Sequence, residues 1–240
     1  MGFIEDTKKI LHYKKIAAYV KKNKKDDMRT GIYYLAGASV ISALTGIIGL
    51  ILNYAFSGFM YPEGSEAFAS TLAAIGWNTP VNAALVMIIS WIVGFIGCIM
   101  GVAITHYIAA ALGGKAKMGE YFYIGGKFIF IVAIVNFILN IFSAVPCINC
   151  ITGILALAFM IYSIYLIILL VSVLYSISML KAFAGIVVSY LVSLIFILLV
   201  LTVLGEITGL PLGLKMYEQM FENYGAMDLG AYSSFNQTTQ

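Results

Sequence analysis

Long, nearly uncharged stretches constrain this chain more than any other feature of its sequence. Five of them, 31–56, 81–112, 124–144, 151–177 and 182–204, consist mostly of apolar residues. A helix needs about 20 such residues to cross the hydrocarbon layer of a bilayer. The whole chain is 62% hydrophobic and 10% charged, whereas about a quarter of the residues in soluble domains are charged. The bilayer is therefore the expected solvent.

The five stretches predict helices rather than strands. Inside lipid, each backbone amide and carbonyl must be paired within its own segment or within a closed barrel. The stretches are apolar on all faces, without the alternation of a membrane barrel. We therefore expect an all-α integral, multi-pass membrane protein, a bundle of five transmembrane helices. The expected domains are a basic amphipathic cytoplasmic segment (1–30), the transmembrane domain (31–206) and an extracytoplasmic C-terminal tail (207–240).

The distribution of basic residues predicts the orientation. If the amino terminus lies in the cytoplasm, Lys115, Lys117, Lys127 and Lys181 join the basic amino-terminal segment on the inside, and only Lys215 lies outside. The positive-inside rule then favours N-in, C-out, which needs an odd number of spans. We expect the plasma membrane for a prokaryotic chain and an endomembrane for a eukaryotic one.

The amino-terminal segment combines an apolar face with many lysines. Ile10, Tyr13, Ala17 and Val20 fall on one side of a helix. Its lysines lie largely around the other sides: Lys8, Lys9, Lys14, Lys15, Lys21 and Lys22. This pattern is typical of an interfacial helix attracted to anionic lipid headgroups. The alternative is a solvated basic tail that only sets the topology. A net charge of only +3 argues against a nucleic-acid partner.

Two Gly-Gly-Lys triplets raise the question of a phosphate-binding loop. Such a loop requires Ser or Thr after the lysine, but Ala116 follows Lys115 and Phe128 follows Lys127. A nucleotide site is therefore not expected. The triplet at 113–115 instead predicts the end of the second span, followed by an interfacial aromatic belt at 121–123. The glycines at 125–126 would let the third helix approach a neighbour closely.

The stretch from His106 to Phe130 and the stretch from Ile161 to Ile195 together resemble the Yip domain of the Ypt-interacting protein family. The resemblance rests on two short motifs within 31–204. Their residues are Leu112, Gly113, Gly114, Lys115, Tyr175, Ser178, Lys181 and Ala182.

This resemblance implies a five-span protein with a cytosolic amino terminus. Eukaryotic relatives act in vesicle trafficking, bind prenylated Rab GTPases and form oligomers with other family members. The acidic, aromatic segment that many of them carry before the first span is replaced here by basic sequence. That replacement argues against the GTPase partnership, and the chain looks closer to prokaryotic members.

Small residues recur at helical spacing in the second and fifth spans. They are Ser90, Gly94, Gly97, Gly101, Gly185, Ser189 and Ser193. Such stripes let membrane helices pack closely, either within one molecule or in a homo-oligomer or a complex with other membrane proteins.

Polar residues in the spans leave two functions open. Asn136 and Asn140 share a helix face and, with His106, could line a small polar cavity. No charged residue is expected deep in a span, which argues against proton or ion-coupled transport. The expected function is a non-enzymatic role in membrane organisation, trafficking or scaffolding, by helix packing and partner recruitment. The alternative is a channel or transporter for a small uncharged solute.

Enzyme signatures and cofactor sites are not evident in the sequence. It has neither a Gly-x-Ser-x-Gly elbow nor a His-Glu-x-x-His motif. Cys147 and Cys150 form one Cys-x-x-Cys pair, too few ligands for structural zinc, and we expect a tight turn there. We therefore expect no catalytic residue, cofactor or metal.

Overall fold

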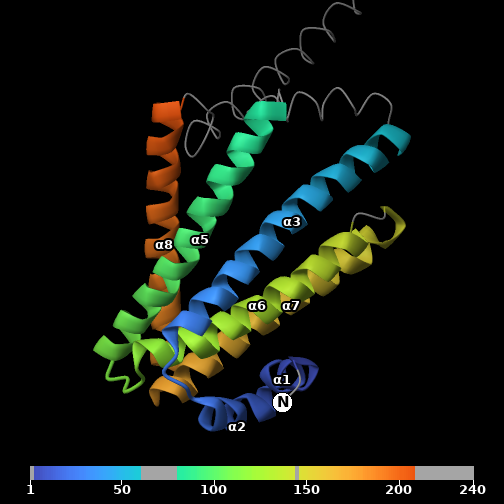
Figure 1. The fold of residues 1–240 in the computed structure, drawn as a ribbon. Helices are drawn as coiled ribbons and strands as arrows, with labels where there is room; N and C mark the ends of the chain where they lie inside the picture. The colour runs from blue at the N-terminus through green and yellow to red at the C-terminus, as the bar shows by residue number, and fades with distance from the viewer. Residues whose placement is uncertain (1–2, 61–79, 144–145, 209–240) are drawn as a thin grey trace, which may run out of the picture. The chain divides into compact units, whose positions relative to one another are not determined.

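The computed structural model describes residues 3–60, 80–143 and 146–208. Regular structure in these ranges is helical throughout. The helices are α1 (Phe3–Ile10), α2 (Tyr13–Asn23), α3 (Met28–Met60), α5 (Pro80–Ala111), α6 (Met118–Ser143), α7 (Pro146–Tyr175) and α8 (Met179–Thr208) (Figure 1). The predicted tail, 207–240, lies outside the described residues except for its first two.

Five of these helices are long and apolar enough to cross a bilayer. The candidate spans are Met28–Gly49, Trp91–Ala111, Met118–Ser143, Cys150–Tyr175 and Met179–Ile207. This result confirms the predicted all-α, multi-pass fold class. The N-in, C-out orientation stays a prediction.

The chain divides into two compact units. One contains residues 1–56 and 94–194, and the other contains residues 57–93 and 195–240. In the described part of the second unit, the Thr202 hydroxyl donates to the Leu198 carbonyl 2.8 Å away. Apart from Ser90, the residues of the sites considered below lie within the first unit.

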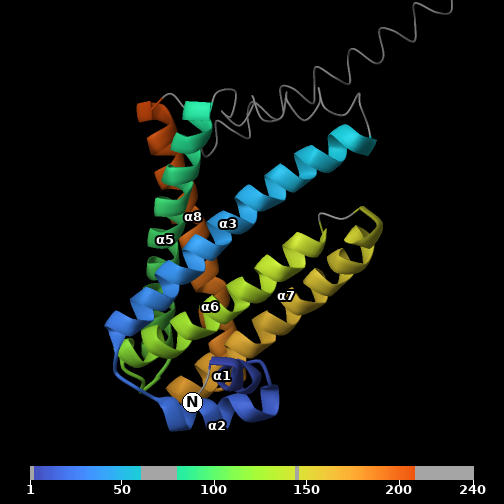
Figure 2. The same ribbon diagram turned by 45° about the vertical axis from the view of Figure 1, so that its right-hand side comes forward.

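The core of the first unit is centred on α6 and α7, which lie side by side in both ribbon views (Figures 1 and 2). Phe122 and Ile131 of α6 and Leu166 and Leu170 of α7 are at most 1% exposed. These four residues sit on the faces that the two helices turn inward. Because the stretches are apolar on every side, the sequence alone did not indicate which face would be buried.

Helix α3 crosses α6 at glycines. A Cβ on Gly126 would lie 2.6 Å from the Gly31 carbonyl oxygen, and a Cβ on Gly31 would overlap the backbone of Phe122. The predicted close approach of the third span is thus confirmed at Gly126. At Gly125, the atoms nearest to an added Cβ belong to the ring of Tyr121, on the same helix.

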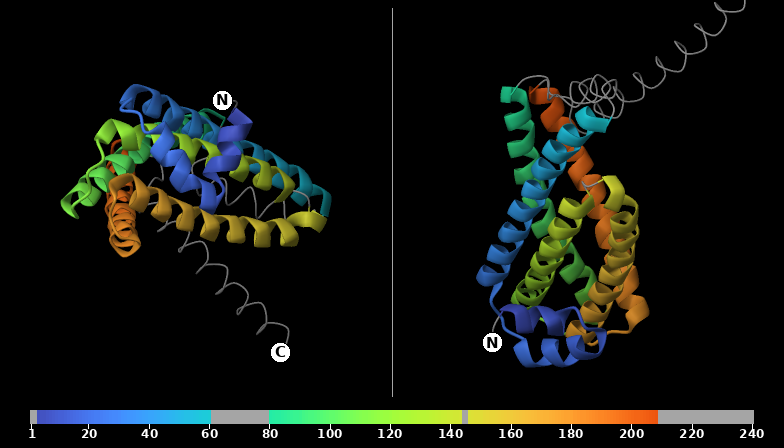
Figure 3. Two further views of the ribbon diagram at one scale, coloured as in Figure 1. Left: turned by 90° about the horizontal axis from the view of Figure 1, so that it is seen from below. Right: turned by 90° about the vertical axis from the view of Figure 1, so that its right-hand side faces the viewer.

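The amino-terminal segment forms two helices rather than one. The chain leaves helical geometry at Leu11 and His12, and the His12 side chain accepts from the Lys14 amide at 3.3 Å, capping α2. Figure 3 shows α1 and α2 lying across one end of the neighbouring helices, and α2 packs against α7. The expected apolar face is wrong at Tyr13, which is 46% exposed because the break at Leu11 and His12 changes the helical register.

Two local expectations for the third and fourth spans are also corrected. Tyr121 and Phe122 do not form an interfacial belt, because α6 turns them into the core, where they are 2% and 0% exposed. The segment Cys147–Cys150 is not a turn but part of the first turns of α7. The Cys150 side chain is free and exposed, whereas the side chain of Cys147 lies outside the described part of the structure.

Candidate functional site

The two sequence motifs meet at the ends of three helices, in what we call the helix-end junction (Leu112–Lys115 and Tyr175–Ala182). At the end of α5, Gly113 adopts a positive φ of 96°. The Gly114 amide donates to the Ala109 carbonyl at 2.9 Å and the Gly113 amide to the Ala110 carbonyl at 3.0 Å. This pair of bonds is a Schellman motif, which satisfies the last carbonyls of the helix. The predicted helix end at Gly113 is confirmed.

Helix α7 ends in the same way without a glycine. Ser176 has a φ of 57°, and the Ile177 amide donates to the Ser172 carbonyl at 3.1 Å. The Ser172 hydroxyl returns a bond to the Ile177 carbonyl at 2.7 Å. Ser178 then begins α8, since its carbonyl accepts from the Ala182 amide at 3.0 Å. The turn between α7 and α8 is therefore held by local bonds.

Backbone and side-chain bonds join the two helix ends. The Lys115 amide donates to the Tyr175 carbonyl at 3.2 Å, and the Lys181 ammonium donates to the Leu112 carbonyl at 3.3 Å. A Cβ on Gly114 would lie 2.6 Å from Cδ1 of Tyr175. The second glycine of the triplet is thus needed for close packing against Tyr175. The sequence around Gly114 did not indicate this packing role.

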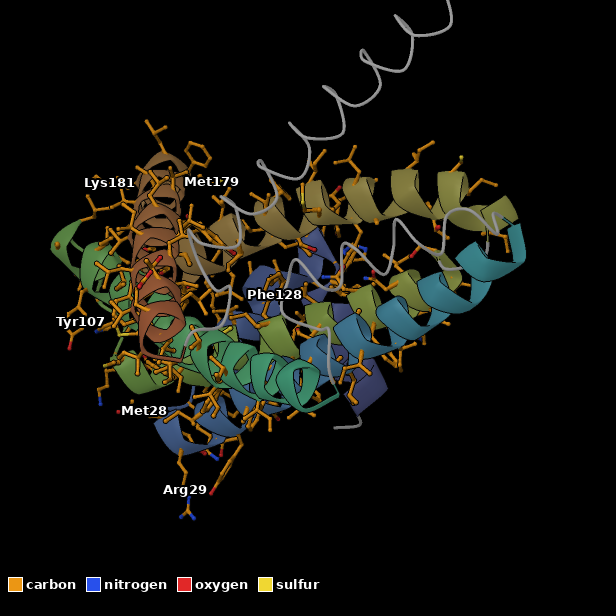
Figure 4. All side chains as sticks on the ribbon, turned by 90° about the horizontal axis from the view of Figure 1, so that it is seen from above. Met28, Arg29, Tyr107, Phe128, Met179 and Lys181 are labelled. Atoms are coloured by element: carbon orange, nitrogen blue, oxygen red, sulfur yellow. The ribbon has the colours of Figure 1, made fainter. Side chains whose placement is uncertain are left out.

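Tyr175 is the centre of the junction. Its hydroxyl lies 2.6 Å from Nδ1 of His106 and shares a hydrogen bond with it. Its ring meets the ring of Tyr121 edge-on, with centroids 5.6 Å apart. Tyr175 is fully buried, whereas Lys181 and Tyr107 mark the periphery in Figure 4, with Phe128 among the helices. One side chain therefore ties α5, α6 and α7 together.

The proposed polar residues of the spans do not form one group. In the part of the chain that the structure describes, His106 bonds to Tyr175 and to neither asparagine. Asn136 and Asn140 are both exposed, and the side-chain amide of Asn140 donates to the backbone carbonyl of Asn136 at 2.9 Å. The two asparagines lie together as expected, but on an exposed face of α6.

The small residues of the second and fifth spans partly face one another. A Cβ on Gly101 would lie 3.3 Å from the Ser193 hydroxyl, and one on Gly185 would lie 3.3 Å from Ile108. Ser189 is buried and donates to the Gly185 carbonyl at 2.7 Å, and Gly97 is also buried. A Cβ on Gly94 would meet open space, and the side chain of Ser90 lies outside the described residues.

A second polar cluster was not expected. The ammonium of Lys127, in the middle of the buried face of α6, lies 2.6 Å from Oδ2 of Asp6 in α1. The two residues are 6% and 7% exposed. Lys127 also lies over the rings of Tyr19 and Tyr34, 5.7 and 6.0 Å from their centroids. Lys127 lies within the candidate span Met118–Ser143, and the expectation that no charge lies deep in a span stays a prediction.

The ion pair is imperfectly satisfied. Asp6 Oδ1 and the Tyr19 hydroxyl are buried without a hydrogen-bond partner. Burial also raises the pKa of Tyr19, because the phenolate would lose its hydration. The two partners are 121 residues apart in the chain, so the sequence around either residue does not indicate the pair.

The lysines expected to bind the membrane surface lie on α1 and α2. Lys8, Lys14, Lys15, Lys21 and Lys22 are exposed, whereas Lys9 is half-buried and pairs with Glu5 at 2.5 Å. Their ammonium groups are available to an anionic surface. The apolar residues beneath them, however, face protein.

Metal-binding clusters were also sought. Within the described ranges, no group of three His, Cys, Asp or Glu side chains could hold a metal ion. The polar groups that the motifs bring together are instead bonded to one another and to helix-end carbonyls. The junction is thus an arrangement that fixes helices.

Comparison with known proteins identifies the family. Neither a curated protein nor a solved structure matches the chain. The model of the Yip1 domain matches residues 10–201, a range that contains the helix-end junction, the first four candidate spans and the fifth as far as Leu201. The chain therefore belongs to the Yip1 domain family.

Proposed function

We propose that this protein is a non-enzymatic membrane scaffold, which recruits other membrane proteins or further copies of itself and so organises the membrane around it. The observation that carries the proposal is the use made of the family motifs. Tyr175, Lys181 and the glycines of the first triplet hold helix ends together. Contacts between helix ends hold the helices in one arrangement. Their outer faces then form a constant surface to which a partner can bind.

The outer faces of α7 and α8 are the surfaces we assign to recruitment. Ile154 is 70% exposed and Leu180 is 77% exposed. Gly153, next to Ile154, has open space where a Cβ would be. Helices in lipid associate through close van der Waals packing at small residues, so a partner helix could approach α7 there. The amino terminus is expected on the cytosolic side.

Photocrosslinking in the native membrane tests the scaffold. A photoreactive amino acid would replace Ile154 or Leu180, and, as matched buried controls, Leu170 or Ala182, which are both 0% exposed. We expect discrete adducts with a small set of membrane proteins, or with a second copy, only from the exposed positions. Adducts with lipid alone from every exposed position would refute recruitment through these helices.

The rival function, a channel or transporter for a small uncharged solute, would use Asn136 and Asn140. Their bond to one another along one helix gives it no additional support. Purified protein in liposomes would be assayed for the flux of glycerol and urea. We expect no flux above that of empty liposomes. Saturable flux that disappears in Asn136→Ala/Asn140→Ala would replace the scaffold by the transporter.

A further inference from the structure

Helices α1 and α2 form a strap, residues 3–23, whose single apolar face has two potential partners. We propose that this strap exchanges between a docked state on the helix bundle and a state bound to an anionic bilayer surface, with the Asp6–Lys127 ion pair as the latch of the docked state. This inference does not depend on the proposed function.

The docked state buries most of the described apolar side chains of the strap against protein. Ile10, Ile16 and Val20 are at most 1% exposed, and α2 lies against α7. At the break between the two helices, the Tyr162 hydroxyl of α7 donates to the Leu11 carbonyl at 2.6 Å. An interfacial helix must insert the same face below the headgroups. One set of side chains thus cannot serve the bundle and the bilayer at the same time.

The opposite face of the strap is built for an anionic surface. It carries exposed lysines along both helices: Lys8, Lys14, Lys15, Lys21 and Lys22. Each lysine near an anionic membrane is attracted to it, and the attraction falls as salt screens it. While the strap is docked, only its lysine-bearing face can contact an anionic membrane, because its apolar face is held against the bundle. Undocking exchanges the protein contacts of the apolar face for lipid contacts and brings the lysines to the headgroups as well, so anionic lipid favours release.

The docked state depends on both partners of the latch being present and charged. Asp6 and Lys127 both lose most of their hydration on docking, and Asp6 Oδ1 and the Tyr19 hydroxyl find no partner. The attraction within a buried ion pair is largely offset by the desolvation of its two charges. Removing only one partner leaves an uncompensated buried charge, which opposes docking strongly.

A short segment can serve as the hinge. Residues 24–27 join α2 to α3, and they attach to the start of α6 by ion pairs between Lys24 and Glu120 at 3.0 Å and between Asp26 and Lys117 at 3.3 Å. These attachments do not include the strap itself. The strap can therefore swing away while α3 stays in place.

The test measures the strap's position in the full-length protein. Spin labels would be placed at Lys15→Cys and Ile154→Cys after replacement of the native cysteines by serine, and the distance between them measured by pulsed EPR. In nanodiscs of phosphatidylcholine we expect one short distance. With 30% phosphatidylserine, a second, longer distance should appear, and high salt should remove it. A distance distribution that is identical in both lipids would overturn the proposal.

Two variants that change the net charge equally isolate the latch. Asp6→Asn removes the charged partner of Lys127, whereas Glu5→Gln removes the same charge from an exposed neighbour that pairs with Lys9. Both raise the positive charge of the strap equally. We expect Asp6→Asn to raise the ratio of undocked to docked strap at least tenfold, and Glu5→Gln to change it less than twofold. Equal responses would show that the ion pair is no latch.

Discussion

The hydroxyl of Tyr175 lies 2.6 Å from Nδ1 of His106, although the two residues are 69 positions apart in the chain. The bond joins the end of α7 to α5, beside the backbone bond from Lys115 to the Tyr175 carbonyl. The family motif therefore works as a clamp between helix ends, and its tyrosine contributes through its ring, its hydroxyl and its carbonyl.

Loss of the Tyr175 hydroxyl should weaken this clamp. Tyr175→Phe removes the partner of His106 while keeping the ring that packs on Gly114. We expect about 0.5–1.5 kcal/mol less stability, the usual net value of one hydrogen bond, measured by unfolding in detergent micelles. Tyr107→Phe is the control, because Tyr107 is the neighbour of His106 and is 65% exposed. Equal stability of the two variants would contradict the assignment.

A methyl group at Gly114 should be destabilising. In Gly114→Ala the Cβ would lie 2.6 Å from the Tyr175 ring and 2.7 Å from the Ala109 carbonyl oxygen. Since a backbone atom and a fully buried ring cannot move easily, we expect a loss of about 1–3 kcal/mol, as for other overpacked sites. Unfolding of the purified protein measures it.

The control for this variant is Gly153→Ala, in the exposed part of α7. A Cβ there meets nothing within 4 Å, and alanine is favoured over glycine inside a helix by about 0.5–1 kcal/mol. Gly153→Ala should therefore be neutral or stabilising. The close-packing role of Gly114 is wrong if both substitutions change stability in the same direction.

The sequence predicts the spans well because membrane insertion depends on local composition. Each of the five apolar stretches corresponds to one long helix, and the glycine at 113 marks the end of α5 through its own backbone freedom. Which side of each helix is buried is harder to predict. Tyr121 and Phe122 have the chemistry of an interfacial belt, yet packing partners from distant segments turn them inward.

The latch could not be predicted for a related reason. Lys127 stands three residues into the third apolar stretch, where a lysine at headgroup level is the ordinary expectation. Only the return of α1 onto α6 supplies Asp6 as its partner, and this return is a tertiary contact across 121 residues. Local patterns carry no information about such a pairing.

The crossing of α3 and α6 gives a third prediction. In Gly126→Ala the new Cβ would lie 2.6 Å from the Gly31 carbonyl oxygen, so the two helix backbones must separate. We expect a loss of stability of about 1–3 kcal/mol and easier proteolysis between α2 and α3. Gly125→Ala is the matched neighbour, since the atom nearest to its Cβ lies in the Tyr121 side chain, 3.2 Å away, and not in a neighbouring backbone. A larger effect at Gly125 would place the crossing elsewhere.

The start of α3 gives a pH-dependent prediction. Asp27 caps the helix, accepting from the Thr30 amide at 3.0 Å and from the Thr30 hydroxyl at 2.8 Å. These bonds, together with one from Lys25, lower the pKa of Asp27 from its usual 3.8 to about 2. A depressed pKa means that the stabilisation is complete above about pH 4 and is lost as the pH falls through about 2.

Asp27→Asn tests the charge of Asp27 separately from its capping role, because it removes the carboxylate and keeps a side chain that can cap the helix. Asparagine is also a good N-cap, so α3 should begin at the same residue, but the variant has no carboxylate to protonate at Asp27. We expect wild type to be the more stable at neutral pH and its advantage to shrink between about pH 4 and about pH 2, as measured by thermal unfolding. Asp26→Asn removes a neighbouring exposed charge that caps nothing. The pH dependence does not come from the cap at Asp27 if the stability difference between wild type and Asp26→Asn shrinks over this pH range as much as the difference between wild type and Asp27→Asn.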